Sequence, residues 1–203
     1  MKNIVLTGIG GQGTVLAAKI LAQAAQTRGW HVRTAETIGM AQRGGSVTSH
    51  VRMGDAGERV ASPLVGEGSA DMLIAFEPGE AARVLKLLSP DGVLVSASSV
   101  KQPVTASLSK TVYQSQPVVD ALKRRSAPTF IVDEEPLLKT VGNARALNIV
   151  LLTVAVAQRD AQGNPMLGIS FDELKDAVSQ CVRPKFVEMN LAAIDAVRES
   201  LGL

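Results

Sequence analysis

A glycine-rich turn directly after a short apolar run is the feature that most restricts how this chain can fold. Residues 4–6 are apolar, and the loop after them spaces Gly8, Gly10 and Gly13 as Gly-x-Gly-x-x-Gly. In this pattern the first glycine turns sharply out of a strand, the second lets backbone approach a phosphate, and the third lets the next helix pack closely. The sequence therefore predicts a strand–loop–helix unit with an anion or nucleotide at the helix N-terminus.

A second glycine loop, residues 39–45, follows another strand-like run and carries Arg43. A guanidinium beside exposed backbone amides suits a phosphate group, so the two loops together favour one phosphate-bearing ligand at the edge of a parallel sheet. The alternative at each loop is a turn that binds nothing, or one that docks a partner chain. The residues expected to hold the ligand are Gly8, Gly10, Gly11, Gln12, Gly13, Thr14, Gln42, Arg43, Gly44 and Gly45.

Strand-like and helix-like segments alternate along the first two thirds of the chain, and the last third is helical. Residues 72–76 are apolar on both sides, as a central parallel strand requires. Residues 46–53 alternate between apolar and polar, which predicts a half-exposed strand, followed by a turn and a short paired strand through Val60. The expected strands are 3–6, 31–35, 46–53, 72–76, 93–95 and 129–132, and the expected helices are 14–27, 80–88, 143–158, 171–182 and 185–201.

These segments predict an α/β fold: a Rossmann-like, open, mostly parallel sheet with helices on both faces and a helical C-terminal third. The chain is 46% hydrophobic but only 3% aromatic, which indicates an aliphatic, alanine-rich core. We expect one domain over residues 1–203. If strands 3–6 and 31–35 are neighbours, the two glycine loops face each other beyond the carboxyl ends of the strands.

Charge and cysteine content exclude several classes of function. A net charge of +2, without a basic run interleaved with aromatic residues, gives no reason to expect nucleic acid as a partner. One cysteine, Cys181, and two histidines cannot build an iron–sulfur cluster or a structural zinc site from this chain alone. We expect Cys181 to be a buried thiol on a helix. No signal peptide or membrane-spanning run is visible, so the expected location is cytoplasmic.

Glu36 keeps an NAD(P)-dependent oxidoreductase open as an alternative. It ends the expected strand 31–35 at about the distance from the first loop at which a ribose-binding acid occurs in dinucleotide-binding folds. Against this alternative, the sequence shows no set of residues for hydride transfer and no second domain to hold a substrate. A purely structural subunit, in which the glycine loops serve only packing, also remains open.

The two loops together resemble a known family. Gly-Ile-Gly-Gly-Gln-Gly at 8–13 and Gln-Arg-Gly-Gly at 42–45 are similar to the gamma-type component of the 2-oxoacid:ferredoxin oxidoreductases. The run 39–52 is most similar to the beta subunit of the indolepyruvate enzymes within that family. The resemblance extends to Asn143 and Asn148 and to the segment 186–190, and it covers nearly the whole chain.

The resemblance implies a non-catalytic subunit of an enzyme of class EC 1.2.7, which decarboxylates a 2-oxoacid oxidatively to acyl-CoA. Indolepyruvate or another arylpyruvate is the substrate that it implies. Thiamine diphosphate and [4Fe–4S] clusters then belong to a larger partner subunit, with two copies of each subunit and with ferredoxin as electron acceptor. Coenzyme A is the one family ligand that this chain is then expected to help bind, through its glycine loops.

Overall fold

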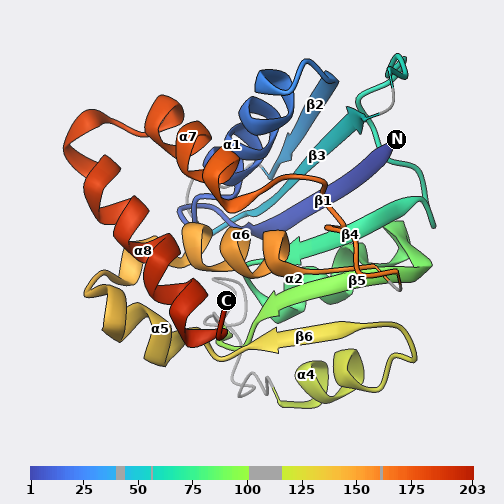
Figure 1. Cartoon of the computed structure of the whole chain (residues 1–203). Helices are drawn as coiled ribbons and strands as arrows, with labels where there is room; N and C mark the ends of the chain where they lie inside the picture. Colours follow the sequence, from blue (N-terminus) through green and yellow to red (C-terminus); the bar gives the residue numbers. More distant parts are fainter. Residues whose placement is uncertain (40–43, 56, 101–115, 161) are drawn as a thin grey trace.

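The computed structural model describes residues 1–39, 44–55, 57–100, 116–160 and 162–203. Within these residues a six-stranded sheet has the order β2-β3-β1-β4-β5-β6, and it forms the middle layer of the molecule (Figure 1). The strands are β1 (Lys2–Ile9), β2 (His31–Ile38), β3 (Ser46–Gly54), β4 (Ala70–Ala75), β5 (Leu88–Ala97) and β6 (Thr129–Val132).

The sheet is mostly parallel, as the sequence predicts. Neighbours among β1, β4, β5 and β6 pair in parallel, whereas β3 pairs antiparallel with both β1 and β2. The condition under which the two glycine loops were expected to face each other, that β1 and β2 are direct neighbours, is therefore not met. The connection between β2 and β3 is short enough for an antiparallel hairpin, and a parallel crossover would need a dozen or more residues.

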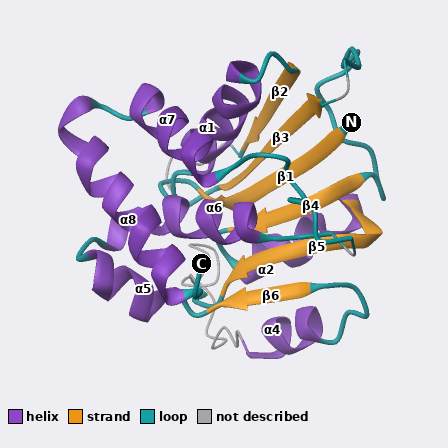
Figure 2. Cartoon of the chain, in the orientation of Figure 1, coloured by secondary structure: helices purple, strands orange, loops and turns teal. Residues whose placement is uncertain are grey.

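Helices cover both faces of the sheet (Figure 2). The larger core lies between the sheet and α1, α6, α7 and α8, and a smaller one lies between the opposite face and α2 and α4. Ten of the eleven residues of α6 are buried, because the sheet lies on one side of it and α8 packs on another. The helices are α1 (Thr14–Thr27), α2 (Pro78–Val84), α4 (Gln116–Lys123), α5 (Glu134–Val141), α6 (Leu147–Ala157), α7 (Phe171–Cys181) and α8 (Val187–Ser200).

The predicted element boundaries agree best with the structure where the sequence contains a local signal. The α1 helix has the expected bounds, and α7 begins at the expected capping box, in which Ser170 Oγ accepts from the Glu173 amide at 3.2 Å. The short helices α4 and α5 were not predicted from the sequence. The expected helix 80–88 corresponds to α2 followed by a 3₁₀ turn, Leu85–Leu87, and Leu88 already begins β5.

Residues 58–69, called the strap below, cross the face of β2 and β3 that lies opposite α1. They contain no strand, so the predicted paired strand through Val60 is wrong. The strap also explains why β3 is not half-exposed. His50 keeps only 7% of its surface accessible, and its Nδ1 accepts a hydrogen bond from the Val65 amide at 3.2 Å.

Candidate functional site

The first glycine loop is the tight turn that its spacing predicts. It joins β1 to α1 at the edge where the parallel strands have their carboxyl ends. A Cβ atom on Gly8 would lie 2.8 Å from Gln12 Oε1 and 2.9 Å from Phe76 Cβ, both too close for any side chain. Gly8 is thus required by packing against the loop itself and against the end of β4.

Gln12 holds this turn together from inside. Its Oε1 accepts from the Ile9 amide at 2.6 Å, and its Nε2 donates to the Phe76 carbonyl at 2.8 Å. The side chain is buried, and both ends of its amide are bonded within the protein. The structure therefore gives Gln12 a bracing role, and the surface that the loop offers to a ligand consists mainly of backbone.

In the described part of the chain, no side chain caps the N-terminus of α1 or offsets the positive end of its helix dipole. Its N-cap residue, Gly13, has φ +85° and supplies no side-chain cap, and the first turn contains no acidic residue. The Thr14 hydroxyl is buried and has no hydrogen-bond partner among the described residues. Such a helix end leaves several amides and the positive end of the helix dipole available to an anion.

Asn148 of α6 lies directly behind the loop. A Cβ atom on Gly13 would lie 3.0 Å from Asn148 Nδ2, so the third glycine of the motif allows α6, as well as α1, to approach the turn. Asn148 is 5% exposed within a helix whose other buried residues are almost all apolar. In the sequence, the presence of one amide side chain in this apolar segment was the feature that could have pointed to a role for Asn148.

The two glycine loops meet at this edge, as expected, although β3 rather than β2 brings them together. The Gly10 amide donates to the Gly45 carbonyl at 2.8 Å. The next residue, Ser46, begins β3, and its Oγ donates to Glu80 Oε2 of α2 at 2.5 Å. Gly44 has φ +80°, a conformation that favours glycine. Gln42 and Arg43 lie outside the described residues.

A groove of about 500 Å³ opens beside the first loop. Lys19 is its charged residue, and it is exposed on α1 one turn beyond Val15, which is 39% exposed. Glycine backbone, one cation and apolar walls suit a ligand with both an anionic and an aliphatic part. The lining residues are Ile9, Gly10, Gly11, Gly13, Thr14, Val15, Leu16, Lys19 and Val47.

The described residues offer no catalytic constellation near the groove. They contain no group of three or more His, Cys, Asp or Glu side chains that could hold a metal ion. Cys181 is half-buried rather than buried, and desolvation raises the pKa of its thiol, so it is a poor nucleophile. Among the described residues, no helix is both long enough and apolar enough to cross a bilayer.

Glu36 is not placed as a ribose-binding acid. It is exposed on the edge strand β2, where it pairs with Ser49 of β3. The whole of β3 separates it from β1, whereas a dinucleotide site needs this acid on the strand next to the glycine loop. The geometry thus argues against the NAD(P) alternative.

A Rossmann-like sheet with an uncapped glycine loop defines an α/β domain with a candidate anion-binding site at the start of α1. The chain belongs to the pyruvate ferredoxin/flavodoxin oxidoreductase family, whose model matches residues 3–200. It is a small subunit of a 2-oxoacid:ferredoxin oxidoreductase, enzyme class EC 1.2.7, as the sequence resemblance implies.

Full-length relatives carry the name indolepyruvate oxidoreductase subunit IorB. The chain is 36% identical to the protein from Pyrococcus horikoshii and 35% identical to that from Thermococcus kodakarensis, with 99% of this chain and 98% of each relative covered. It is 34% identical to the protein from Archaeoglobus fulgidus, with 95% of this chain and 91% of the relative covered.

Solved structures share the fold. The gamma subunit of a keto/oxoacid ferredoxin oxidoreductase from Geobacter sulfurreducens is 23% identical, with a TM-score of 0.66 and full coverage of both chains. A 2-oxoglutarate:ferredoxin oxidoreductase from Magnetococcus marinus, solved with 2-oxoglutarate, coenzyme A and succinyl-CoA bound, is 19% identical, with a TM-score of 0.67. The whole of this chain corresponds to 31% of that one.

Proposed function

We propose that this chain helps to bind coenzyme A in an indolepyruvate or other arylpyruvate:ferredoxin oxidoreductase that converts the 2-oxoacid to acyl-CoA. The observation that carries the proposal is the uncapped N-terminus of α1, joined to the second glycine loop by the bond from Gly10 to Gly45. The substrate class is taken from the relatives named indolepyruvate oxidoreductase subunit IorB.

The chemistry of the loops fits the diphosphate of coenzyme A. The amides at the start of α1 supply donors, and Lys19 supplies a cation at the rim. Gly11 has φ +102° with open space around it, so the backbone there can approach a ligand closely. The apolar wall formed by Val15 and Leu16 suits the aliphatic arm of the ligand.

The redox and decarboxylation chemistry belongs to another subunit in this proposal. Thiamine diphosphate supplies the electron sink for decarboxylation, and iron–sulfur clusters carry the electrons to ferredoxin. One cysteine in 203 residues cannot ligate a cubane, so this chain needs a partner that holds both groups. We propose a hetero-oligomer with a large subunit, with two copies of each.

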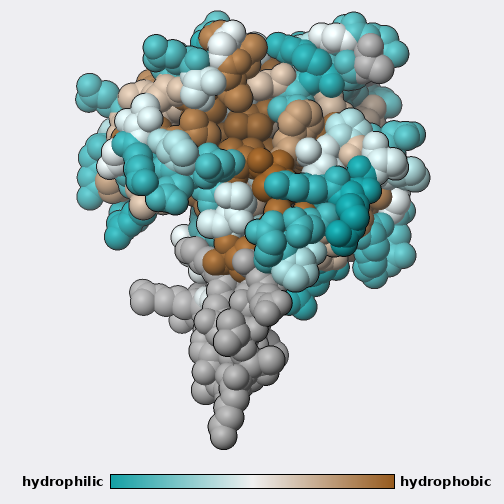
Figure 3. Space-filling model, turned by 90° about the horizontal axis from the view of Figure 1, so that it is seen from below, coloured by the Kyte–Doolittle hydropathy of each residue, from teal (hydrophilic) through white to brown (hydrophobic). Residues whose placement is uncertain are grey.

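The surface offers an apolar area for such an assembly. Viewed from the side of α4 and β6, apolar residues gather between hydrophilic flanks (Figure 3). A groove of about 820 Å³ lies along β6 and the C-terminus, where Phe130 is 42% exposed and Leu203 is 56% exposed. Obligate interfaces are more apolar than ordinary protein surface, which supports a stable heteromer.

The test is steady-state kinetics of the complex reconstituted with Arg43→Ala, varying each substrate in turn. A charge-assisted hydrogen bond to a phosphate contributes about 1.5–3 kcal/mol, so the KM for coenzyme A should rise roughly ten- to hundred-fold while the KM for the 2-oxoacid stays the same. Arg33→Ala is the matched control, because Arg33 is exposed near the start of β2, away from the loops. Lys19→Gln should act in the same direction as Arg43→Ala, but less strongly.

Three outcomes would contradict the proposal. An unchanged coenzyme A dependence in Arg43→Ala would make the second loop a structural element. Loss of assembly in that variant, with normal assembly of Arg33→Ala, would make it a docking element. Tight NAD(P) binding, or 2-oxoacid-dependent dye reduction, by the purified chain alone would favour the alternative function of a stand-alone oxidoreductase.

A further inference from the structure

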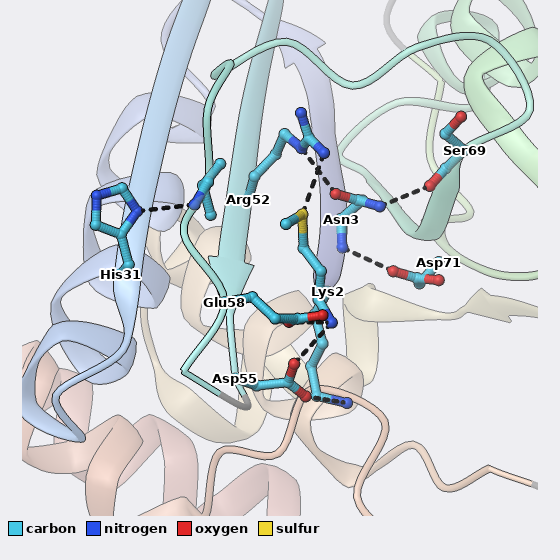
Figure 4. A network of polar contacts seen from close by, with 10 residues as sticks. Lys2, Asn3, His31, Arg52, Asp55, Glu58, Ser69 and Asp71 are labelled. Atoms are coloured by element: carbon cyan, nitrogen blue, oxygen red, sulfur yellow. Dashed lines mark hydrogen bonds and ion pairs between the residues drawn. The ribbon is translucent and has the colours of Figure 1, made fainter.

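Both histidines of the chain hold the strap by the same kind of bond. His31 on β2 accepts from the Val60 amide at 3.1 Å through Nδ1, and His50 on β3 accepts from the Val65 amide at 3.2 Å through Nδ1. Figure 4 shows the His31 ring turned toward the strap backbone. A histidine nitrogen can accept only while it carries no proton, so both bonds require neutral rings.

The surroundings of the His50 ring oppose its protonation. Val60 and Val65 are both buried, so the strap excludes water from this face, and desolvation lowers the pKa of His50. Arg33 on β2 and Arg52 on β3 are cross-strand partners. Because alternate residues of a strand share a face, both arginines lie on the same side of the sheet as the two histidines.

Acidic groups around this face are engaged elsewhere. Glu58 of the strap pairs with the amino group of Met1, and Glu67 pairs with Lys86. On β4, Asp71 accepts from the Asn3 amide at 2.7 Å (Figure 4). The charged residues on the elements packed against this face are Arg33 on β2, Arg52 on β3, Asp71 on β4, Glu58, Arg59 and Glu67 on the strap, and Glu77, Glu80 and Arg83 on α2.

Arg52 gives the strap an attachment that does not involve the histidines. Its Nη1 donates to the Ser62 carbonyl at 2.9 Å, between the two histidine bonds along the strap. Loss of the histidine bonds therefore releases the backbone at Val60 and Val65, while the Ser62 carbonyl and both ends of the strap stay attached.

We infer that the strap is an acid-sensitive latch, fastened by neutral His31 and His50 and loosened when protons occupy their Nδ1 atoms. Each proton comes from solvent and turns an acceptor into a donor that faces a backbone N–H. The loosened strap uncovers the face of β2 and β3 on which Val60 and Val65 are now buried. This device is independent of any ligand at the glycine loops.

Amide hydrogen exchange of the full chain, followed residue by residue by NMR, tests the latch. Because desolvation lowers the pKa of His50, the window must reach well below the ordinary histidine pKa. Between about pH 7.5 and about pH 4.5, the protection factors of the Val60 and Val65 amides should fall roughly ten-fold, as expected for the loss of one hydrogen bond each. The amides that join β2 and β3 should keep their protection because the ladder does not depend on the histidines.

The matched variant is His31→Asn combined with His50→Asn. An asparagine Oδ1 takes nearly the place of Nδ1 and accepts the same bond, but it does not titrate in this range. Protection of Val60 and Val65 should then be the same at both pH values. Equal protection at both pH values in the unmodified chain, an equal loss in the asparagine variant, or a simultaneous loss throughout the ladder would each overturn the inference.

Discussion

Removal of the Gln12 side chain should cost far more stability than a surface glutamine normally does. In Gln12→Ala the Ile9 amide and the Phe76 carbonyl lose the bonds of 2.6 Å and 2.8 Å that the side chain now makes. Phe76 is fully buried and Ile9 is partly buried, so neither group regains a full bond to water. Each buried group left without a partner costs about 1–3 kcal/mol, and the amide of the partly buried Ile9 falls at the low end, so the total is roughly 2–4 kcal/mol.

The measurement is urea unfolding of the purified chain, with thermal unfolding beside it. For a chain of 203 residues, this loss corresponds to a fall in Tm of roughly 5–15 °C. The slope of the unfolding free energy against urea concentration, the m-value, should stay unchanged. Gln12→Glu keeps the shape but sets a carboxylate oxygen against the Phe76 carbonyl, so it should destabilise at least as much. Gln23→Ala is the control, because Gln23 on α1 bonds with Gln180 in an exposed position. It should change stability by less than about 0.5 kcal/mol.

A loss of stability below about 1 kcal/mol in Gln12→Ala, or an equal loss in Gln23→Ala, would contradict this prediction. Either result would mean that the loop keeps its shape without the internal amide. Gln12 would then be free to act as a ligand-binding side chain, as the motif alone suggests.

Two further predictions concern the α7 helix. Ser170→Ala removes the side chain that caps α7 and should lower stability by about 1 kcal/mol in urea unfolding, whereas Ser179→Ala in the last turns of the same helix should have a much smaller effect. Cys181 should react with a thiol reagent more slowly than free cysteine at about pH 8, because desolvation raises its pKa and lowers the thiolate fraction. A rate equal to that of free cysteine, followed by absorbance, would show that the thiol is not desolvated.

The sequence by itself determined the elements whose signals are local. The glycine spacing specified the turn between β1 and α1, and the serine and glutamate of the capping box specified the start of α7. The alternation of apolar runs specified an α/β sheet. These features follow from backbone conformation and short-range hydrogen bonds, so a few neighbouring residues contain all the information.

The order of the strands was decided only by tertiary structure. The same hydrophobic runs fit a sheet in which β1 and β2 are neighbours, and only the pairing of β3 with both of them rules it out. Strand pairing depends on contacts between segments far apart in the chain, which periodicity does not encode. For the same reason the strap over His50 was missed: the residues that cover it lie on a segment with no regular structure of its own.

At the candidate site, too, the sequence motif determined some features and the tertiary structure determined others, for the same physical reason. The motif places Gly8, Gln12 and Gly13 in one loop, but it does not say that Gln12 turns inward to Phe76 or that Asn148 stands behind Gly13. Glycine positions are fixed by the local backbone, whereas the direction of a polar side chain is fixed by whichever buried partner lies within reach. That partner comes from β4 and α6, and only the folded chain brings them to the loop.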